Sequence, residues 1–187
     1  QKAIQKYLQY LSRKRFNAKT LARRLASIKS LYKYLMSRKI VDVNITKGVK
    51  TPRTKKELPH YLSFEEARKI LTIPSGQDRN TLRDRVILEL FYATGVRISE
   101  LVNIQFKHLR LEEGIIHVIG KGNKERIVMI GGEAQRILRK YIVFLNDEKL
   151  DGPKNFLFPA LRKNKKNNLG HIAIRTVFNI VKKYLRQ

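Results

Sequence analysis

A polar and basic stretch at residues 46–59, TKGVKTPRTKKELP, divides the chain in two. It has one glycine, two prolines and no hydrophobic period, a composition typical of an interdomain linker. Apolar residues at helical spacing occur on both sides of it. A chain of 187 residues has room for one domain with a real core or for two small ones. We therefore expect two folded units, residues 1–47 and 61–187, joined by a basic linker over residues 48–60.

The first unit carries the pattern of two amphipathic helices. Apolar residues keep helical spacing in the first helix at Ile4, Leu8 and Leu11. In the second helix the corresponding positions are Leu21, Leu25, Ile28, Leu31, Tyr32 and Leu35. Either Asn17 or Thr20 is a suitable N-cap for this second helix. Two helices make a thin core, so we expect further helices before the first residue of this sequence.

The second unit is predicted to be mostly helical with one small sheet. Ser63 and Glu66 form the pattern of a capping box, which marks a helix start, and Gly95 is a suitable left-handed residue to end another helix. Two β-rich runs, IIHVI and RIVMI, flank GKGN and indicate a hairpin. Further helices are expected over residues 134–145 and at the end of the sequence, with apolar positions Val177, Phe178, Val181 and Tyr184. The predicted fold class is mainly α with a small antiparallel β-sheet, the α+β class.

Charge is the feature of composition that says most about partners. The sequence has 41 basic and 15 acidic residues, a net charge of +26 and a pI ≈ 10.6. A surplus of this size favours a polyanionic partner, above all nucleic acid. Residues 1–41 hold twelve basic and no acidic residues, so the first unit is the more cationic per residue. Basic residues on both units would let them grip a duplex together, although charge alone also fits a ribosomal-type protein that coats RNA.

Composition excludes or disfavours other classes of protein. No apolar run approaches the roughly 20 residues of a membrane helix, and 42% hydrophobic residues are too many for a disordered tail. Cysteine is absent, which excludes disulfides, cysteine-ligated zinc and thiol chemistry. The histidines have no partner at the spacing of a metal site; they are His60, His108, His117 and His171. The sequence also shows no convergent carboxylates of the kind that a two-metal nuclease needs. We expect no metal, no cofactor, no membrane partner and a cytoplasmic location.

The first motif that can carry chemistry is ATGVRISEL. Arg97 comes just after a glycine that ends a helix, where its guanidinium and free backbone N–H groups can converge on a phosphate. Glu100, three residues on, lies on the same helical face and can hold the guanidinium in place. The alternative is an ordinary surface ion pair, which contributes only about a few tenths of a kcal/mol.

The second motif is GKGNKER. Lys121 lies between two glycines at the expected hairpin tip, where a side chain is mobile and exposed. It can reach a DNA groove and donate a proton to a leaving oxygen. The alternative is an ordinary basic turn, and the pattern of a phosphate-binding Walker loop is absent. If the protein cuts or joins DNA, the sequence points to basic residues and no metal.

Together, residues 91–130 (FYATGVRISELVNIQFKHLRLEEGIIHVIGKGNKERIVMI) closely resemble the catalytic core of the tyrosine recombinases, the phage-integrase and Xer family. In that family a motif like ATGxRxSEL carries a catalytic arginine and a hairpin like GKGNKER carries a catalytic lysine, positions that Arg97 and Lys121 match. The resemblance extends over essentially the whole chain. It implies that residues 1–47 are the C-terminal part of a helical core-binding domain. Residues 61–187 would then be the N-terminal part of the catalytic domain.

This resemblance implies a site-specific DNA recombinase that cleaves and rejoins strands through a 3′-phosphotyrosine intermediate, without ATP or metal. Arg97 would neutralise charge on the phosphate oxygens, Lys121 would protonate the leaving 5′-oxygen, and Glu100 would support Arg97. The implied partner is double-stranded DNA, bound by a homotetramer on two recombination sites. Contacts to the DNA backbone are expected from Arg13, Lys14, Arg15, Lys19, Arg23, Arg24, Lys29, Lys124 and Arg126.

The sequence departs from the family pattern near its C-terminal end. The family's HxLRH-type motif and nucleophilic tyrosine are not present, and none of the eight tyrosines lies in a nucleophile motif. We therefore expect a fragment that binds duplex DNA and does not cleave it. One alternative is a non-catalytic DNA-binding module derived from a recombinase. Another is a type IB topoisomerase, which shares the chemistry, but the motif sequences here are Xer-like and argue against it.

Overall fold

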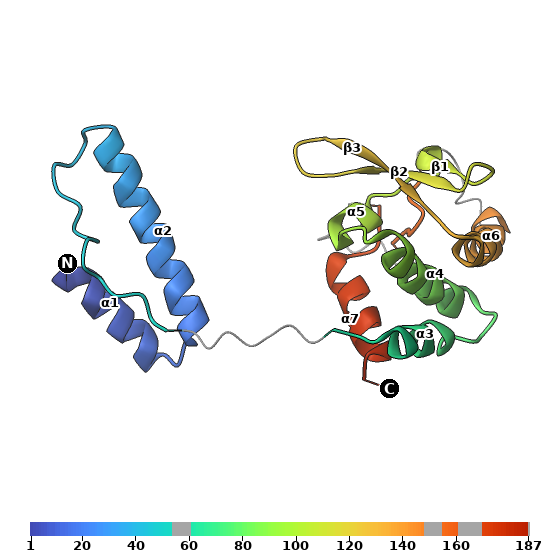
Figure 1. Ribbon diagram of the computed structural model, residues 1–187, viewed down its shortest axis with the longest axis horizontal. Helices are drawn as coiled ribbons and strands as arrows, with labels where there is room; N and C mark the ends of the chain where they lie inside the picture. The colour runs from blue at the N-terminus through green and yellow to red at the C-terminus, as the bar shows by residue number, and fades with distance from the viewer. Residues whose placement is uncertain (54–60, 148–154, 161–169, 187) are drawn as a thin grey trace. The chain divides into compact units, whose positions relative to one another are not determined.

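The computed structural model describes residues 1–53, 61–147, 155–160 and 170–186. The chain divides into two compact units, Gln1–His60 and Tyr61–Gln187. The described part of the first unit is helical, and that of the second combines helices with a small antiparallel sheet (Figure 1). The predicted α+β class is therefore confirmed. Among these residues, no helix has the length and apolarity that crossing a bilayer requires.

The first unit is built on two helices, α1 (Lys2–Arg13) and α2 (Ala18–Ser37). The side chain of Asn17 accepts a hydrogen bond from the Thr20 N–H at 2.7 Å, so Asn17 and not Thr20 caps α2. The core of this unit is small. Its central cluster of buried side chains is Ile4, Leu25 and Val49, against which Leu8, Ile28 and Ile45 pack, and Leu11 and Leu21 are buried as well.

Two positions in the first unit differ from the sequence prediction. Leu31 is 53% exposed, although its spacing predicts the apolar face of α2. Helix α1 has 12 residues and α2 has 20, and the shorter helix does not cover every apolar position of the longer one. Val49 falls in the predicted linker, yet it is only 4% exposed and belongs to the core. The folded unit thus continues past residue 47, and residues 54–60 of the predicted linker lie outside the described residues.

Helices α3 (Phe64–Thr72) and α4 (Arg79–Thr94) open the second unit, and their ends follow the sequence signals. The Ser63 hydroxyl accepts a hydrogen bond from the Glu66 N–H at 3.2 Å, and the Glu66 carboxylate accepts one from the Ser63 N–H at 2.7 Å. This reciprocal pair is the predicted capping box. Gly95 has a φ of +59°, the left-handed conformation predicted to end α4.

The sheet has strand order β1-β2-β3 and is antiparallel throughout. Its strands are β1 (Leu109–Arg110), β2 (Ile115–Ile119) and β3 (Glu125–Met129). Strands β2 and β3 form the predicted hairpin, whose last pair is Ile119 with Glu125. Positive φ angles at Gly122 (76°) and Asn123 (58°) build its turn. Strand β1 and the 3₁₀ helix η1 (Phe106–His108) are too short to leave a period in the sequence.

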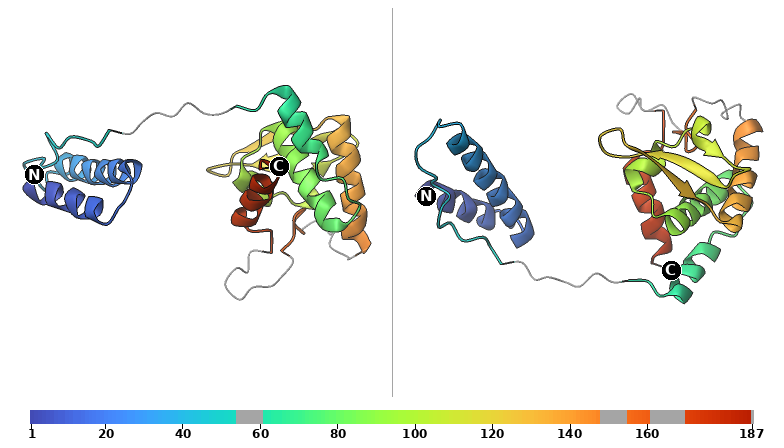
Figure 2. Two further views of the ribbon diagram at one scale, coloured as in Figure 1. Left: turned by 90° about the horizontal axis from the view of Figure 1, so that it is seen from below. Right: turned by 45° about the horizontal axis from the view of Figure 1, so that its top comes forward.

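Helix α4 runs through the middle of the second unit, with α3, α6 (Gly132–Asp147) and α7 (Ile174–Tyr184) around it (Figures 1 and 2). Because it is surrounded, α4 buries residues on several of its sides, including the charged Asp84 and Glu89. Its buried apolar side chains are Leu82, Val86, Ile87, Leu88 and Leu90. The short helix α5 (Ile98–Val102) follows it and lies beside the β2–β3 hairpin (Figure 1).

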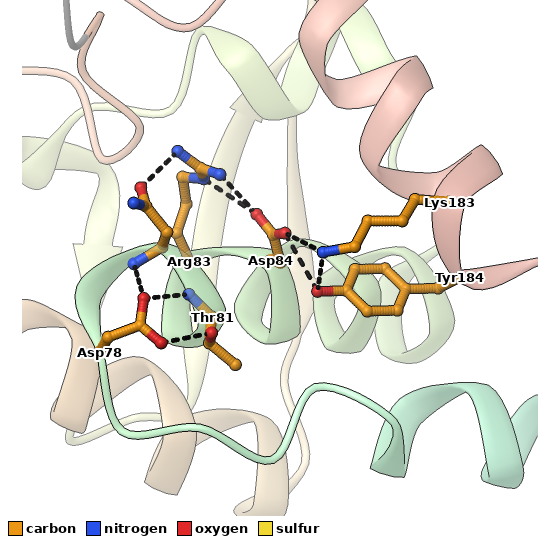
Figure 3. Close-up of polar contacts among 7 residues, drawn as sticks. Asp78, Thr81, Arg83, Asp84, Lys183 and Tyr184 are labelled. Carbon is orange, nitrogen blue, oxygen red and sulfur yellow. Dashed lines mark hydrogen bonds and ion pairs between the residues drawn. The ribbon is translucent and has the colours of Figure 1, made fainter. Parts of the chain in front are cut away.

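Polar contacts around the buried Asp84 tie α7 to α4 (Figure 3). The Tyr184 hydroxyl donates a hydrogen bond to Asp84 at 3.1 Å, and the Arg83 guanidinium donates to the other carboxylate oxygen at 2.6 Å. The Lys183 ammonium lies 4.0 Å from the oxygen that Tyr184 contacts. Asp84 is therefore compensated on both sides, and the end of α7 is fixed on the first turns of α4.

One apolar residue of helix α7 lies outside the face that the helix buries. The predicted helix is present and Val177, Ile180 and Tyr184 are buried, but Phe178, another of its apolar positions, is 53% exposed. Adjacent residues of a helix point about 100° apart, which turns Phe178 away from the side that Val177 buries. Its ring lines an apolar groove of about 430 Å³ together with residues of α3 and α4, among them Ile70.

Candidate functional site

Arg97 lies where α4 ends and α5 begins. After Gly95 it takes an extended conformation, φ −72° and ψ 150°, at the N-cap position of α5. Its side chain is 74% exposed, so the guanidinium is open to a ligand. The Arg97 N–H is not free for a phosphate as the sequence predicts, because it donates to the Glu100 carboxylate at 2.8 Å.

Glu100 is the acceptor that holds Arg97. Its side chain is 2% exposed, and it accepts hydrogen bonds of 2.8 Å from the Arg97 N–H, Arg97 Nη1 and Arg126 Nη2. Burial raises the pKa of this carboxyl, but the hydrogen bonds from Arg97 and Arg126 together outweigh burial and lower the pKa to about 2. The predicted pairing of Arg97 with Glu100 is confirmed. It differs from an ordinary surface pair because the carboxylate is buried and, with its lowered pKa, ionised at neutral pH.

Lys121 lies exposed in the turn of the β2–β3 hairpin. The preceding residue, Gly120, approaches Glu100 closely, since a Cβ atom at Gly120 would lie 3.2 Å from Glu100 Oε1. The Gly120 N–H donates to the Lys124 carbonyl oxygen at 2.8 Å and closes the turn. Figures 1 and 2 show α5 beside this turn. Glu100 thus bonds Arg97 and lies close to the base of the turn that carries Lys121.

Arg126 has a partner that the sequence does not reveal. The sequence places Arg126 among the contacts to a DNA backbone, whereas the structure directs its guanidinium to Glu100. It lies on β3 opposite Val118, and its side chain is 42% exposed. No local spacing relates Glu100 to Arg126, so only the fold brings them together.

The basic side chains of the first unit lie on α1, α2 and the turn between them. Exposed among them are Arg13, Lys14, Arg15, Lys19, Arg23 and Arg24, and half-buried is Lys29. Arg24 stacks on the Phe16 ring, 4.7 Å from its centroid, and donates to the Tyr7 hydroxyl at 3.1 Å. The Lys29 ammonium lies 3.5 Å from Thr51 Oγ1. On the hairpin of the second unit, Lys124 is exposed.

Histidines and acidic residues do not gather into a metal site in the described part of the chain. His108 Nδ1 accepts a hydrogen bond from the Gln105 N–H at 3.1 Å and so closes the 3₁₀ helix, and burial lowers the His108 pKa. His171 packs edge-on against Phe156, with ring centroids 5.1 Å apart. His117 is half-buried on β2, and His60 lies outside the described residues.

Both units match known sequence families. Residues 60–186 match the phage integrase family, and residues 1–39 match the phage integrase N-terminal SAM-like domain. A tyrosine recombinase XerC from Syntrophus aciditrophicus is 37% identical over 183 residues, which are 97% of this chain and 58% of that protein. The chain spans 55–62% of the length of three such curated relatives, all tyrosine recombinases XerC.

Solved structures with the same fold are also similar over the whole chain. A crystal structure of XerA recombinase is 26% identical with a TM-score of 0.57, covering 98% of this chain and 60% of that one. A lambda integrase tetramer bound to a Holliday junction has a TM-score of 0.64, covering 99% of this chain and 52% of that one. At 14% identity the lambda integrase comparison concerns the fold alone.

Proposed function

Because the chain belongs to the phage integrase family, we propose that it forms part of a site-specific DNA recombinase that works through a 3′-phosphotyrosine intermediate. The resemblance carried by ATGVRISEL and GKGNKER is confirmed at the level of the family. The observation that carries the proposal is the arrangement around Glu100. One buried carboxylate fixes the exposed Arg97 guanidinium and lies close to the base of the turn that bears Lys121.

Arg97 is assigned to the phosphate oxygens. Attack on a phosphodiester concentrates negative charge on the two non-bridging oxygens, and a preorganised guanidinium stabilises that charge without reorganisation. Arg97 suits this task because its guanidinium is exposed while Nη1 is held by Glu100. Loss of one such donor typically lowers the rate by about 10²–10³-fold.

Lys121 is assigned to the leaving group. In strand cleavage the phenolic oxygen of a tyrosine forms a bond to phosphorus and gives its proton to water, while the bond from phosphorus to the 5′-oxygen breaks. The 5′-oxygen takes a proton from the Lys121 ammonium, and rejoining reverses each step. We assign the tyrosine, and the HxLRH-type motif, to residues outside this sequence. The length of the relatives supports this, since the chain spans only 58% of the XerC protein.

Eight cations of the two units, all exposed except the half-buried Lys29, are assigned to the DNA backbone. Such contacts release counterions and position the duplex, but they carry little sequence information. The residues are Arg13, Lys14, Arg15, Lys19, Arg23, Arg24, Lys29 and Lys124. A lambda integrase of the same fold forms a tetramer on a Holliday junction, which supports a homotetramer on two recombination sites for the complete protein. A duplex DNA substrate supports a cytoplasmic location.

The experiment uses the complete protein that the reading frame encodes, and a DNA site selected from a random-sequence library by binding. A nick beside the scissile phosphate lets the short 5′-hydroxyl strand diffuse away, so the covalent protein–DNA adduct accumulates and is counted on a denaturing gel. Arg97→Ala is expected to lower adduct formation by about 10²–10³-fold with nearly unchanged DNA affinity. Lys121→Ala is also expected to form little adduct on the ordinary substrate. Adduct formation should recover on a substrate with sulfur as the bridging 5′ atom, because a thiolate leaves without a proton.

Arg139→Ala is the matched control. Arg139 is a half-exposed arginine of α6, paired with the exposed Glu112 at 3.0 Å, so its loss removes the same charge from the same unit. It is expected to cleave like the wild type. A complete wild-type protein that binds the site and forms no adduct would reject the recombinase and leave a DNA-binding module. Wild-type cleavage by Arg97→Ala would reject the role of Arg97.

A further inference from the structure

We propose that Arg126 is a positioning residue: it acts through Glu100 to hold the hairpin of Lys121 in register with Arg97. This inference rests on the proposed recombinase function, and it replaces the role of DNA-backbone contact for Arg126. Under this proposal the positions of Arg97 and Lys121 are coupled through Glu100. A displacement of the hairpin then changes the position of Lys121 relative to Arg97.

The two oxygens of Glu100 divide their donors between two segments of the chain. Oε1 accepts from Arg97 Nη1, while Oε2 accepts from both the Arg97 N–H and Arg126 Nη2. Glu100 Oε2 is therefore the atom at which α5 and β3 meet. Because the Glu100 side chain is 2% exposed, water does not readily replace either donor.

Two observations place the base of the hairpin against Glu100, and one of them is a direct bond. The first is the Arg126 ion pair at 2.8 Å. The second is Gly120, which lies so close to Oε1 that a Cβ there would stand 3.2 Å away. Lys121 follows Gly120 directly, and the turn beyond it needs positive φ at Gly122 and Asn123. The turn itself is exposed, so the position of Lys121 depends on the base of the hairpin.

Arg126 also suits this task better than a DNA contact. The side chain of Arg126 is 42% exposed, whereas that of Arg97 is 74% exposed, although both donate to the same carboxylate. A planar guanidinium offers donors in a fixed fork, which a lysine ammonium does not. Arg126 uses one donor of this fork, Nη2, which holds Glu100 Oε2 at 2.8 Å and adds a positive charge beside the carboxylate.

The first test is single-turnover cleavage by the complete protein with saturating DNA. A displacement of about 1 Å at a reacting group can lower a rate by about 10²-fold, so Arg126→Met is expected to be slower by about 10–100-fold at nearly unchanged affinity. The bridging 5′-sulfur substrate should restore most of this loss, because it needs no proton from Lys121. In a Glu100→Gln background, Arg126→Met should add little, since both changes break one interaction. Arg139→Met, an equal loss of charge, should cleave like the wild type.

A DNA contact would give a different pattern. Arg126→Met would then bind DNA more weakly, and its binding would release about one counterion fewer. The bridging 5′-sulfur substrate would not restore its cleavage rate. That pattern, or cleavage by Arg126→Met equal to Arg139→Met, would overturn the inference while the recombinase assignment stands. No adduct with the wild-type protein would instead reject the recombinase itself.

A second test needs neither cleavage nor DNA. In the 187-residue chain, the heteronuclear ¹⁵N–¹H Overhauser effect of the Gly120–Lys124 amides reports how well the turn is held. Arg126→Met should lower it, Arg126→Lys should lower it less, and Arg139→Met should not change it. Far-UV circular dichroism checks that each variant is folded. Unchanged turn dynamics in a folded Arg126→Met protein would overturn the inference.

Discussion

Replacing Glu100 with glutamine tests the physical basis of the site directly. Glu100→Gln keeps the size of the side chain but removes the charge that Arg97 and Arg126 share. Glutamine keeps one acceptor oxygen, and its NH₂ group then faces a guanidinium, which has no acceptor. At least one arginine therefore loses its partner, and a buried polar group is left poorly satisfied.

The size of the effect follows from the pKa of the carboxyl. The Glu100 pKa is about 2 in the folded protein, against an ordinary value of 4.5. This difference corresponds to about 3 kcal/mol of stability at neutral pH. Because the folded pKa is the lower one, the stability is fully present above pH 4.5 and is lost as the pH falls toward 2. At roughly pH 3, about 2 kcal/mol of this contribution to the free energy of unfolding should be lost.

The assay is urea unfolding of the 187-residue chain at pH 7 and pH 3, followed through the amide resonances of β2, which report on the second unit alone. Glu100→Gln should be less stable than the wild type by about 3 kcal/mol at pH 7, and by about 1 kcal/mol at pH 3. The exposed Glu113→Gln is the control and should change stability by less than about 0.5 kcal/mol. A variant as stable as the wild type at pH 7, or a difference independent of pH, would refute the reasoning.

Three further predictions concern other contacts. Tyr184→Phe should lower the stability of the second unit by about 2 kcal/mol in urea unfolding, because the buried Asp84 loses a donor, whereas the exposed Tyr92→Phe should cost less than about 0.5 kcal/mol. Gly120→Ala should cost about 1–3 kcal/mol, since its methyl group presses on Glu100 Oε1; equal stability would contradict the close approach. The affinity of the 187-residue chain for duplex DNA, measured by fluorescence anisotropy, should fall by about 10-fold or more between roughly 50 and 200 mM salt, and a flat response would refute the role of the basic surfaces.

Local signals in the sequence were sufficient to predict most of the helix ends and the hairpin. The capping box at Ser63, the cap at Asn17 and the left-handed Gly95 each depend on residues within one turn of each other. The hairpin follows from two β-rich runs around a glycine-containing turn. Such features form from neighbours along the chain, so spacing is enough to identify them.

Periodicity predicts which side of a helix is apolar, but not how far a neighbouring element covers it. Leu31 and Phe178 have the right spacing and are exposed, because α1 does not cover all of α2, and α7 borders an open groove. Val49 shows the opposite error. It lies in a polar stretch that predicts a linker, yet its side chain is buried in the small core of the first unit. Coverage of this kind depends on tertiary packing, which no single segment encodes.

The same limit decides which arginine becomes part of a site. The Glu133–Arg136 and Arg97–Glu100 pairs have the same spacing and nearly equal distances, 2.7 and 2.8 Å. In the first pair both side chains are half exposed, so water and salt compete with the contact. In the second the carboxylate is only 2% exposed, because the hairpin lies against it and Arg126 occupies its other side. A chain with a net charge of +26 has many arginines that can meet a phosphate, but a buried carboxylate can give one of them a fixed direction. The cation that the fold orients is therefore the one to which we assign the chemistry.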